Sequence, residues 1–521
     1  MSAETLAGEA LIQQNLERFL LVLSVSLSVA TLPQVFSWAR QIPYTLLLVI
    51  VGAALALVDV RLVYLSPELI LSIFLPPLLF EAAWNLKWSN LRQDFFPITL
   101  YAILGVIISV LGIAFGLSQF TNLPIAIALL VGASLSATDP VSVIALFRDL
   151  GVGERPKTLL EGESLFNDGV AVVAFGLLVG IPLGLQTFEL RQTVMDFFIV
   201  VGVGVGVGSL IGFGISYLTQ RFDLPLVEQS LTLVSAYGTY LITEELGGSG
   251  VIGVVTVGLV LGNFGSRIGM NPRTRVIVSE FWEFLAFFVN SIVFLLIGDQ
   301  IQFSSLLDNL DLIGITIVAM LITRAITIFR LGARANGIAN KEIKRPEQTA
   351  IWWGGLRGSV SIALALSVPI VLDGRDEIIA TVFGVVLFTL LAQGLTMKPV
   401  LTALNLLGDL PLKQAYDEMV ARRVALKRVA DRLRTIDPRP DVDAEFYRYQ
   451  EALLTGQIQE IDSKLEKMRQ EHPQLREYAM ERVRSELLAI EADTYAEFVK
   501  TGQLNQELAP FLPEVFETPG H

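Results

Sequence analysis

The sequence predicts an all-α integral membrane protein that carries a charged helical tail. Of its 521 residues, 53% are hydrophobic and only 17% are charged, whereas a soluble domain has about 25% charged residues. The mean hydropathy is +0.59, and apolar runs recur at lengths that can cross a bilayer. The composition changes near residue 407, so we expect a transmembrane domain over 1–406 and a charged tail over 407–521.

The apolar runs predict about thirteen transmembrane helices, because one crossing takes roughly 20 mostly apolar residues. The second and ninth runs are short, and the count falls to twelve if one of them re-enters the membrane without crossing it. The predicted segments are 15–38, 43–58, 64–84, 96–118, 124–147, 158–183, 194–220, 226–245, 250–264, 276–301, 309–334, 348–370 and 376–404.

The loops between these segments differ in their content of Lys and Arg. With the N-terminus outside, the outer loops hold only Arg61, Arg191 and Arg375, and the other basic loop residues lie inside. Positively charged loops stay in the cytoplasm, so we expect the N-terminus outside and the C-terminus in the cytoplasm. The N-terminus lacks the features of a signal peptide. The cell membrane (inner or plasma membrane) is the expected location, and an internal membrane is the alternative.

The tail is predicted to form three amphipathic helices. "ALKRVADRLR" (425–434) places its apolar residues on one helical face, and "DPRPD" (437–441) and "HPQ" (472–474) separate that helix from two more. Two roles stay open for the tail. It can act as a solubilising or dimer-contacting domain, or it can regulate a response to ions or pH.

Several functional classes are excluded or disfavoured by composition. The chain has no cysteine, and its two histidines, His472 and His521, lie near the C-terminus, so thiolate chemistry and imidazole-based pH sensing in the membrane are excluded. A net charge of −13 argues against nucleic-acid binding. No GxxxxGK[ST] pattern occurs, which argues against an ATP-driven pump. We expect no enzymatic activity and no cofactor.

The stretch "VVGVGVGVGSLIGFG" (200–214) alternates like a strand but lies in a long apolar segment, which favours a helix. Its glycines then form overlapping small-xxx-small pairs that permit close helix packing. Structural packing is the expected role.

The fifth segment contains "GASLSATDPVSVIALF" (132–147). Pro140 lacks an amide hydrogen and disfavours helical geometry at the preceding residue, so we expect the helix to break near Thr138 and Asp139. Broken helices expose carbonyls and helix ends at mid-membrane, where transporters bind ions. An ordinary proline kink capped by Asp139 and Thr138 is the alternative.

The sixth segment contains "LLEGESLFNDGVAVVAFGLLVG" (159–180). Ser164 and Asp168 are four residues apart and share a helical face. A carboxylate at membrane depth costs several kcal/mol and marks a pathway or a relay, and hard cations prefer oxygen ligands. Asp168 and Asp139 lie on consecutive helices, so they can meet at one site. A buried acid paired for stability is the alternative for Asp168.

Two arginines in apolar segments need partners. Arg324 lies in "MLITRAITIF", and Arg357 lies in "WWGGLRGSVSIALAL", whose glycines weaken the helix. We expect Arg324 to pair with Glu163, which would offset buried charge, and Arg357 to balance helix-end charges in a second broken helix.

Six stretches together resemble the sodium/proton antiporters of the bacterial NhaP type, which are related to the NHE exchangers of animals. They cover most of residues 64–370, and their joint occurrence in this order is specific to that family. They are "FLPPLLFEAAW" (74–84), "ATDPVSV" (137–143), "EGESLFNDGVAVV" (161–173), "GLVLGN" (258–263), "FWEFLAFFVNSIVFLLIG" (281–298) and "GGLRGSVSIALAL" (354–366).

The resemblance implies two inverted six-helix repeats joined by the seventh helix, in a homodimer within the lipid bilayer. It implies that Asp168 carries the ion and that Asp139 lines the site. The remaining cation shell would come from the Thr138 backbone, the Ser164 hydroxyl and Glu81. Asn167 would hold the unwound region, and Glu163 and Arg324 would form the structural ion pair of the family.

The resemblance favours Na⁺ or Li⁺ over K⁺ in exchange for H⁺. Related electrogenic antiporters carry Asp at the position of Asn167, so exchange is expected to be electroneutral, one cation for one proton, with both competing for Asp168. A K⁺/H⁺ antiporter, a monovalent cation channel and a membrane sensor that signals through the tail are the alternatives.

Overall fold

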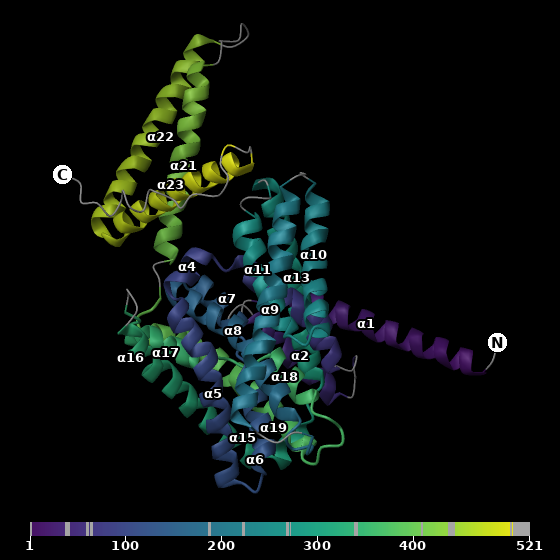
Figure 1. Cartoon of the computed structure of the whole chain (residues 1–521). Coiled ribbons are helices and arrows are strands. Elements are labelled where there is room, and N and C mark those ends of the chain that lie inside the picture. Colours follow the sequence, from purple (N-terminus) through teal and green to yellow (C-terminus); the bar gives the residue numbers. More distant parts are fainter. Residues whose placement is uncertain are drawn as a thin grey trace. The chain divides into compact units, whose positions relative to one another are not determined.

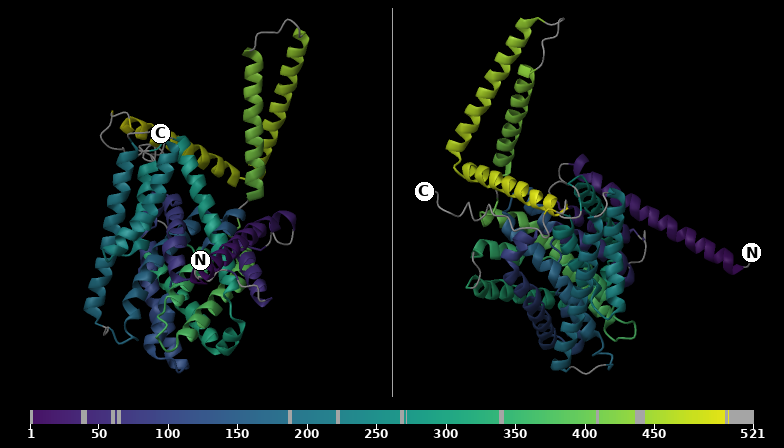
Figure 2. Two further views of the ribbon diagram at one scale, coloured as in Figure 1. Left: turned by 90° about the vertical axis from the view of Figure 1, so that its right-hand side faces the viewer. Right: turned by 45° about the horizontal axis from the view of Figure 1, so that its top comes forward.

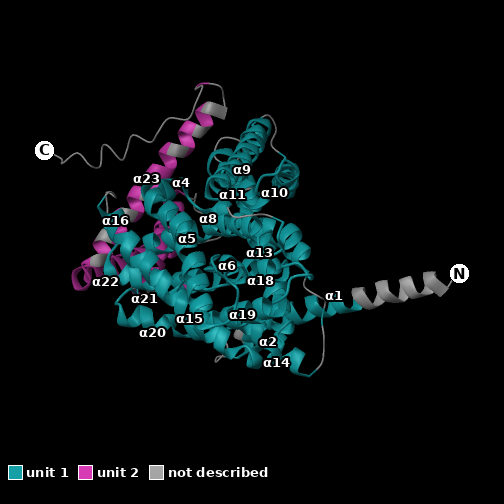
Figure 3. Cartoon of the chain, turned by 60° about the horizontal axis from the view of Figure 1, so that its bottom comes forward, with its two compact units in different colours: residues 1–148, 152–407 teal, residues 149–151, 408–521 magenta. Residues whose placement is uncertain are grey.

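Every regular element in the described part of the chain is a helix (Figure 1). The computed structural model describes residues 3–36, 42–58, 62, 66–185, 189–220, 224–266, 270, 272–337, 342–407, 410–435, 443–500 and 503. The chain divides into two compact units (Figure 3), one formed by 1–148 with 152–407 and the other by 149–151 with 408–521.

Each predicted apolar segment coincides with one helix or with two or three consecutive helices of the first unit. Six helices in the described residues are long and apolar enough to cross a membrane, and four more are shorter and apolar. The number of crossings and the inverted repeats stay predictions. The six are Phe95–Phe120 (α5), Glu154–Val179 (α8), Leu190–Thr219 (α9), Thr274–Asp299 (within α13, Pro272–Asp299), Leu310–Asn336 (α15, η4 and α16) and Arg375–Ala403 (α19, η5 and α20).

Helix contacts sort the first unit into two bundles. In bundle A, α13 packs on α2 and α3, and α11 packs on α3, α9 and α10. In bundle B, α5 packs on α6, α8 and α15, and α19 packs on α6, α15 and α18. The helices of bundle A not yet delimited are α1 (Ala3–Val35), α2 (Tyr44–Leu57), η2 with α3 (Leu69–Phe74, Leu75–Asn85), α10 (Pro225–Glu245) and α11 with η3 (Gly250–Val260, Leu261–Gly265).

Two helices of bundle B are broken. The first consists of α6 (Ile125–Ser134) and α7 (Val141–Asp149), and the second of α17 (Arg345–Trp353) and α18 (Ser359–Leu366). The first interruption ends at Pro140 and the second spans the glycine-rich stretch 354–358. Both breaks were predicted from these residues, because proline removes a backbone donor and glycine weakens a helix.

The glycine-rich helix α9 packs closely on α11, as its small-residue pattern predicts. A Cβ atom added at Gly208 would meet the Gly253 carbonyl oxygen at 2.5 Å, and one at Gly212 would meet Val260 at 2.9 Å. Gly202 and Gly206, on another face, have nothing within 4 Å. The close contact with α11 therefore involves one glycine face only.

The second unit contains the three predicted tail helices, α21 (Leu410–Thr435), α22 (Ala444–Glu471) and α23 (Gln474–Lys500). α21 and α22 lie side by side (Figure 2). Tyr416 on α21, Leu465 on α22 and Leu475 on α23 form a buried cluster shared by the three helices. The "HPQ" break lies between α22 and α23, and the "DPRPD" break lies outside the described residues.

Candidate functional site

The two broken helices cross and are joined by their backbones. The Asp139 amide in the first break donates a hydrogen bond to the Leu356 carbonyl oxygen in the second, at 2.8 Å. Neither residue belongs to a helix, so their backbone groups are free to bond outside the helical ladder. The crossing brings four helix ends to one place.

Asp139 lies at the N-terminal ends of α7 and α18. Its Oδ1 accepts a hydrogen bond from the Val141 amide at 3.2 Å, and its carboxylate also accepts one from the Ser359 amide. A negative charge is stabilised at helix N-termini by the exposed amides and the helix dipole. A Cβ atom at Gly358 would collide with the Asp139 carboxylate, so the absence of a side chain there allows this approach.

Arg357 caps the C-terminal end of α6. Its Nη1 donates to the carbonyl oxygens of Ser136 and Ala137, at 2.8 Å each, and its own amide donates to Thr389 Oγ1 at 3.1 Å. The expectation that Arg357 balances helix-end charges in the second broken helix stays a prediction. Its side chain reaches across the crossing to carbonyls of the first broken helix, which carry partial negative charge, and the sequence did not predict this contact.

Thr138 is held at three points by α8. Its amide donates to Asn167 Oδ1 at 3.2 Å, its hydroxyl oxygen accepts from Asn167 Nδ2 at 2.7 Å, and its carbonyl accepts from the Ser164 hydroxyl. Both α8 residues are buried. The unwound stretch therefore has a fixed position relative to α8.

Glu163 and Arg324 form the predicted ion pair. Arg324 Nη1 lies 2.8 Å from Glu163 Oε1, and Nη2 lies 3.3 Å from Oε2. The guanidinium also donates to the carbonyls of Trp352 at 3.2 Å and Ile351 at 3.0 Å. These carbonyls end α17, so the pair both offsets buried charge and caps a half-helix, a second contact that the sequence did not reveal.

Asp168 lies on α8, four residues after Ser164, and is 9% exposed. Its Oδ1 is buried and has no hydrogen-bond partner among the described residues. Asp139 and Arg357 are the charged side chains that act on it electrostatically. A buried carboxylate oxygen without a partner is costly, and such groups in membranes mark functional sites.

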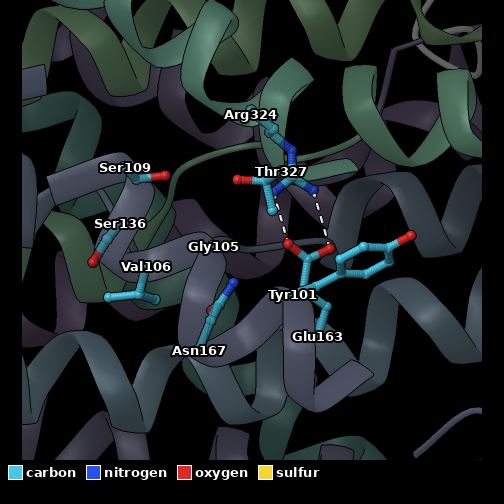
Figure 4. Close-up of a pocket in the computed structure, with 9 residues that line it drawn as sticks. All are labelled: Tyr101, Gly105, Val106, Ser109, Ser136, Glu163, Asn167, Arg324 and Thr327. Atoms are coloured by element: carbon cyan, nitrogen blue, oxygen red, sulfur yellow. Dashed lines mark hydrogen bonds and ion pairs between the residues drawn. The ribbon is translucent and has the colours of Figure 1, made fainter. Parts of the chain in front are cut away.

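A polar cavity lies between Asn167 and the Glu163–Arg324 pair (Figure 4). Buried polar space of this kind commonly holds ordered water. The Tyr101 hydroxyl is also buried without a hydrogen-bond partner in the described part of the chain. The cavity is lined by Tyr101, Gly105, Val106, Ser109, Ser136, Glu163, Asn167, Arg324 and Thr327.

Glu81 on α3 lies in a different charged environment. Its Oε1 accepts a hydrogen bond from Asn85 at 2.6 Å. Among the described residues, its charged neighbours are Arg148, Glu161 and Glu283 rather than Asp139 or Asp168. Its expected place in the cation shell stays a prediction.

The site thus joins residues from separated parts of the sequence. Asp139, Thr138, Ser164 and Asp168 come together as predicted from their types and spacing. Sequence reasoning missed Thr389, which holds the Arg357 backbone, and the carbonyls that Arg324 and Arg357 cap. A threonine in an apolar helix and carbonyls at unknown helix ends carry no distinctive sequence signal.

Comparisons with known proteins point to one family. The family model described as "Sodium/hydrogen exchanger, transmembrane" matches residues 23–403. The chain is 63% identical to "Na(+)/H(+) antiporter ApNhaP" of Aphanothece halophytica, over 100% of both chains. It is 59% identical to "Low-affinity Na(+)/H(+) antiporter NhaS1" of Synechocystis sp., over 98% of both.

A solved structure has the same fold. The sodium proton antiporter MjNhaP1 from Methanocaldococcus jannaschii matches 76% of this chain and 100% of its own, with a TM-score of 0.61 and 20% identity. The family match covers most of the chain, and the full-length relatives share well over half of its residues. The chain therefore belongs to the sodium/hydrogen exchanger family.

Proposed function

We propose that this protein is a secondary active antiporter that exchanges Na⁺ or Li⁺ for H⁺ at Asp168. The observation that carries the proposal is the buried Asp168 carboxylate, whose Oδ1 has no partner among the described residues and which lies beside Asp139 at the crossing of two broken helices. Family membership and the names of the full-length relatives support Na⁺ and H⁺ as the exchanged ions.

The exchange follows from competition at one carboxylate. Ionised Asp168 binds the cation, with Asp139, the Thr138 carbonyl and the Ser164 hydroxyl as further oxygen ligands. A proton on Asp168 excludes the cation. The empty, charged carboxylate crosses poorly because an uncompensated charge is costly at membrane depth, and this penalty prevents uncoupled leak.

The supporting residues keep the oxygen ligands in place while the site opens first to one side of the membrane and then to the other. Asn167 positions Thr138, Arg357 and Arg324 cap the ends of α6 and α17, and Glu163 holds Arg324. Because Asn167 carries no charge, Asp168 is neutral when it crosses with either a cation or a proton. We therefore propose electroneutral exchange, one for one.

The remaining expectations belong to the same proposal. The protein would be a homodimer with thirteen crossings in two inverted repeats, moving by a rigid-body shift of one bundle against the other. It would lie in the cell membrane with its N-terminus outside and the tail, residues 407–521, in the cytoplasm, and its tail would be a separate domain. The distribution of basic residues between loops supports this orientation.

Reconstitution into sealed liposomes tests the function. The membrane potential is clamped at zero, an outward Na⁺, Li⁺ or K⁺ gradient is imposed, and a trapped dye reports internal pH. The proposal predicts saturable, Na⁺- and Li⁺-driven acidification, with a weaker K⁺ response. Sodium flux without proton movement would favour the channel, and a dominant K⁺ response would favour the K⁺/H⁺ antiporter.

A further inference from the structure

A buried hydrogen bond joins the two bundles near the site. Thr45 Oγ1 on α2 bonds to Ser142 Oγ on α7. Thr45 is 5% exposed and Ser142 is 8% exposed. α2 belongs to bundle A, and α7 continues the broken helix of bundle B. The bond therefore spans the boundary at which the proposed rigid-body movement would occur.

Other buried side-chain bonds lie within one bundle. Trp84–Ser279 and Trp282–Thr232 lie in bundle A, and Arg324–Glu163 lies in bundle B. The Trp88 amide does bond to Asn263, but Trp88 begins α4 (Trp88–Gln93), the short helix that connects the bundles along the chain. Away from Glu81, whose charged neighbours include Arg148 and Glu161 of bundle B, part of the boundary is apolar. Gly169 on α8, for example, faces the side chain of Ile252 on α11.

These two kinds of contact respond differently to a shift. Apolar surfaces can slide with little change in energy because dispersion contacts are weak and non-directional. A hydrogen bond depends on distance and angle, and it is lost when its partners separate. A shift of the bundles that separates Thr45 from Ser142 would therefore break this bond.

Each partner is linked to its own bundle through the residue that precedes it. Thr45 follows Tyr44, whose hydroxyl bonds to the Ser26 carbonyl oxygen on α1 and to Ser291 Oγ on α13. Ser142 follows Val141, whose amide donates to the Asp139 carboxylate. Movement at the bond is thus transmitted directly to the half-helix that begins beside the site.

We propose that Thr45 and Ser142 are positioning residues for exchange, forming a latch that holds the bundles in one of their two arrangements and must open in each cycle. The inference rests on the proposed exchange function, because the latch has a role only if the bundles move. Thr45 and Ser142 lie outside the proposed cation shell.

The absence of cysteine from the chain makes a direct test possible. In a Thr45→Cys, Ser142→Cys variant, the two sulfur atoms take the places of hydroxyl oxygens that are in hydrogen-bond contact, which suits a disulfide. An added oxidant removes two electrons and two protons from the thiols, and a reductant reverses the reaction. We expect the cross-link to form readily and to lower Na⁺-driven proton movement at least about tenfold, with full recovery on reduction.

A cross-link within one bundle is the matched control. A Cβ at Gly265 on η3 would lie 3.4 Å from the Ser216 Cβ on α9, close to disulfide spacing. The oxidised Ser216→Cys, Gly265→Cys variant should keep its reduced-state rate within about twofold. Failure of the Thr45–Ser142 pair to cross-link, or continued exchange after it cross-links, would overturn the latch.

A second pair of variants tests the hydrogen bond without a covalent lock. Thr45→Val keeps the shape and removes the hydroxyl, and Thr45→Ser keeps the hydroxyl. We expect the maximal exchange rate to change about three- to tenfold in Thr45→Val, as for the loss of one hydrogen bond, and to stay within about twofold in Thr45→Ser. Equal rates in all three proteins would contradict the proposal.

The two proposals fail in distinguishable ways. If the wild-type chain shows no exchange with any cation, the proposed function fails, and the cross-linking rate of the Thr45→Cys, Ser142→Cys variant with and without Na⁺ then tests the latch. A latch predicts that Na⁺ changes the rate for Thr45–Ser142 at least about twofold and leaves the Ser216–Gly265 rate unchanged. A rate insensitive to Na⁺ in both pairs would overturn the latch as well.

Discussion

Asn167 fixes the position of Thr138 and adds no charge beside Asp168. Its amide oxygen accepts from the Thr138 backbone, and its amide nitrogen donates to the Thr138 hydroxyl. Only an uncharged side chain with both a donor and an acceptor makes this pair of contacts without adding charge beside Asp168. The resemblance to the antiporter family implied that Asn167 holds the unwound region. The atoms involved depend on the fold.

Asn167→Asp should preserve the fold and change the electrical behaviour. The aspartate can still accept from the Thr138 amide, and the Thr138 hydroxyl can rotate to donate. The added charge moves with the site, so we expect exchange in the variant to respond to an imposed membrane potential, while wild-type exchange does not. Rates at potentials set by K⁺ and valinomycin measure this. A wild type that responds strongly to potential would contradict one-for-one exchange.

Gly358→Ala should impair the site directly. The new Cβ would collide with the Asp139 carboxylate, which is fixed by two helix N-termini, so relief requires movement of the crossing. Overpacking of this kind costs about 1–3 kcal/mol. We expect a lower thermal midpoint and at least about tenfold slower exchange. Gly176→Ala, at a glycine with nothing within 4 Å, is the control, and equal loss in both variants would argue against the collision.

At the scale of helices, the sequence predicted both helix breaks. It did not predict which arginines bond to the carbonyls at the broken ends. Pro140 and the glycines of 354–358 are local signals, because they act on the backbone at their own positions. The capping of α17 by Arg324 and of α6 by Arg357 joins residues far apart in the sequence. A single sequence does not specify which carbonyls a buried arginine reaches, so only its need for partners could be inferred.

The glycine face of α9 gives a prediction at the same scale. Gly208→Ala would place a Cβ 2.5 Å from the Gly253 carbonyl oxygen, whereas Gly206→Ala meets nothing within 4 Å. Both changes raise helix propensity equally, so their difference isolates the contact between α9 and α11. We expect Gly208→Ala to unfold several degrees lower than Gly206→Ala by scanning fluorimetry in detergent. The reverse order would show that α9 does not pack this way.

For the whole molecule, the sequence predicted the membrane class, the helix positions and the separate tail helices from composition and periodicity. The grouping into bundles A and B was not accessible, because it depends on which apolar faces pair, and apolar residues of similar size pair with little specificity. That grouping matters for function. It places Asp139, Asp168 and the residues bonded to Thr138 within bundle B and leaves a partly apolar boundary with bundle A.

The central claim is that Na⁺ and H⁺ compete for Asp168. The most direct test measures the apparent half-saturation of exchange by Na⁺ as a function of pH, in the wild type, Asp168→Asn and the exposed-acid control Asp311→Asn. Competition predicts that half-saturation rises about tenfold per unit of pH on the acidic side, by mass action, while saturating Na⁺ restores the maximal rate. Asp311→Asn should behave as the wild type and Asp168→Asn should not exchange. An acid-induced loss that saturating Na⁺ does not reverse, or exchange by Asp168→Asn, would contradict a shared carboxylate.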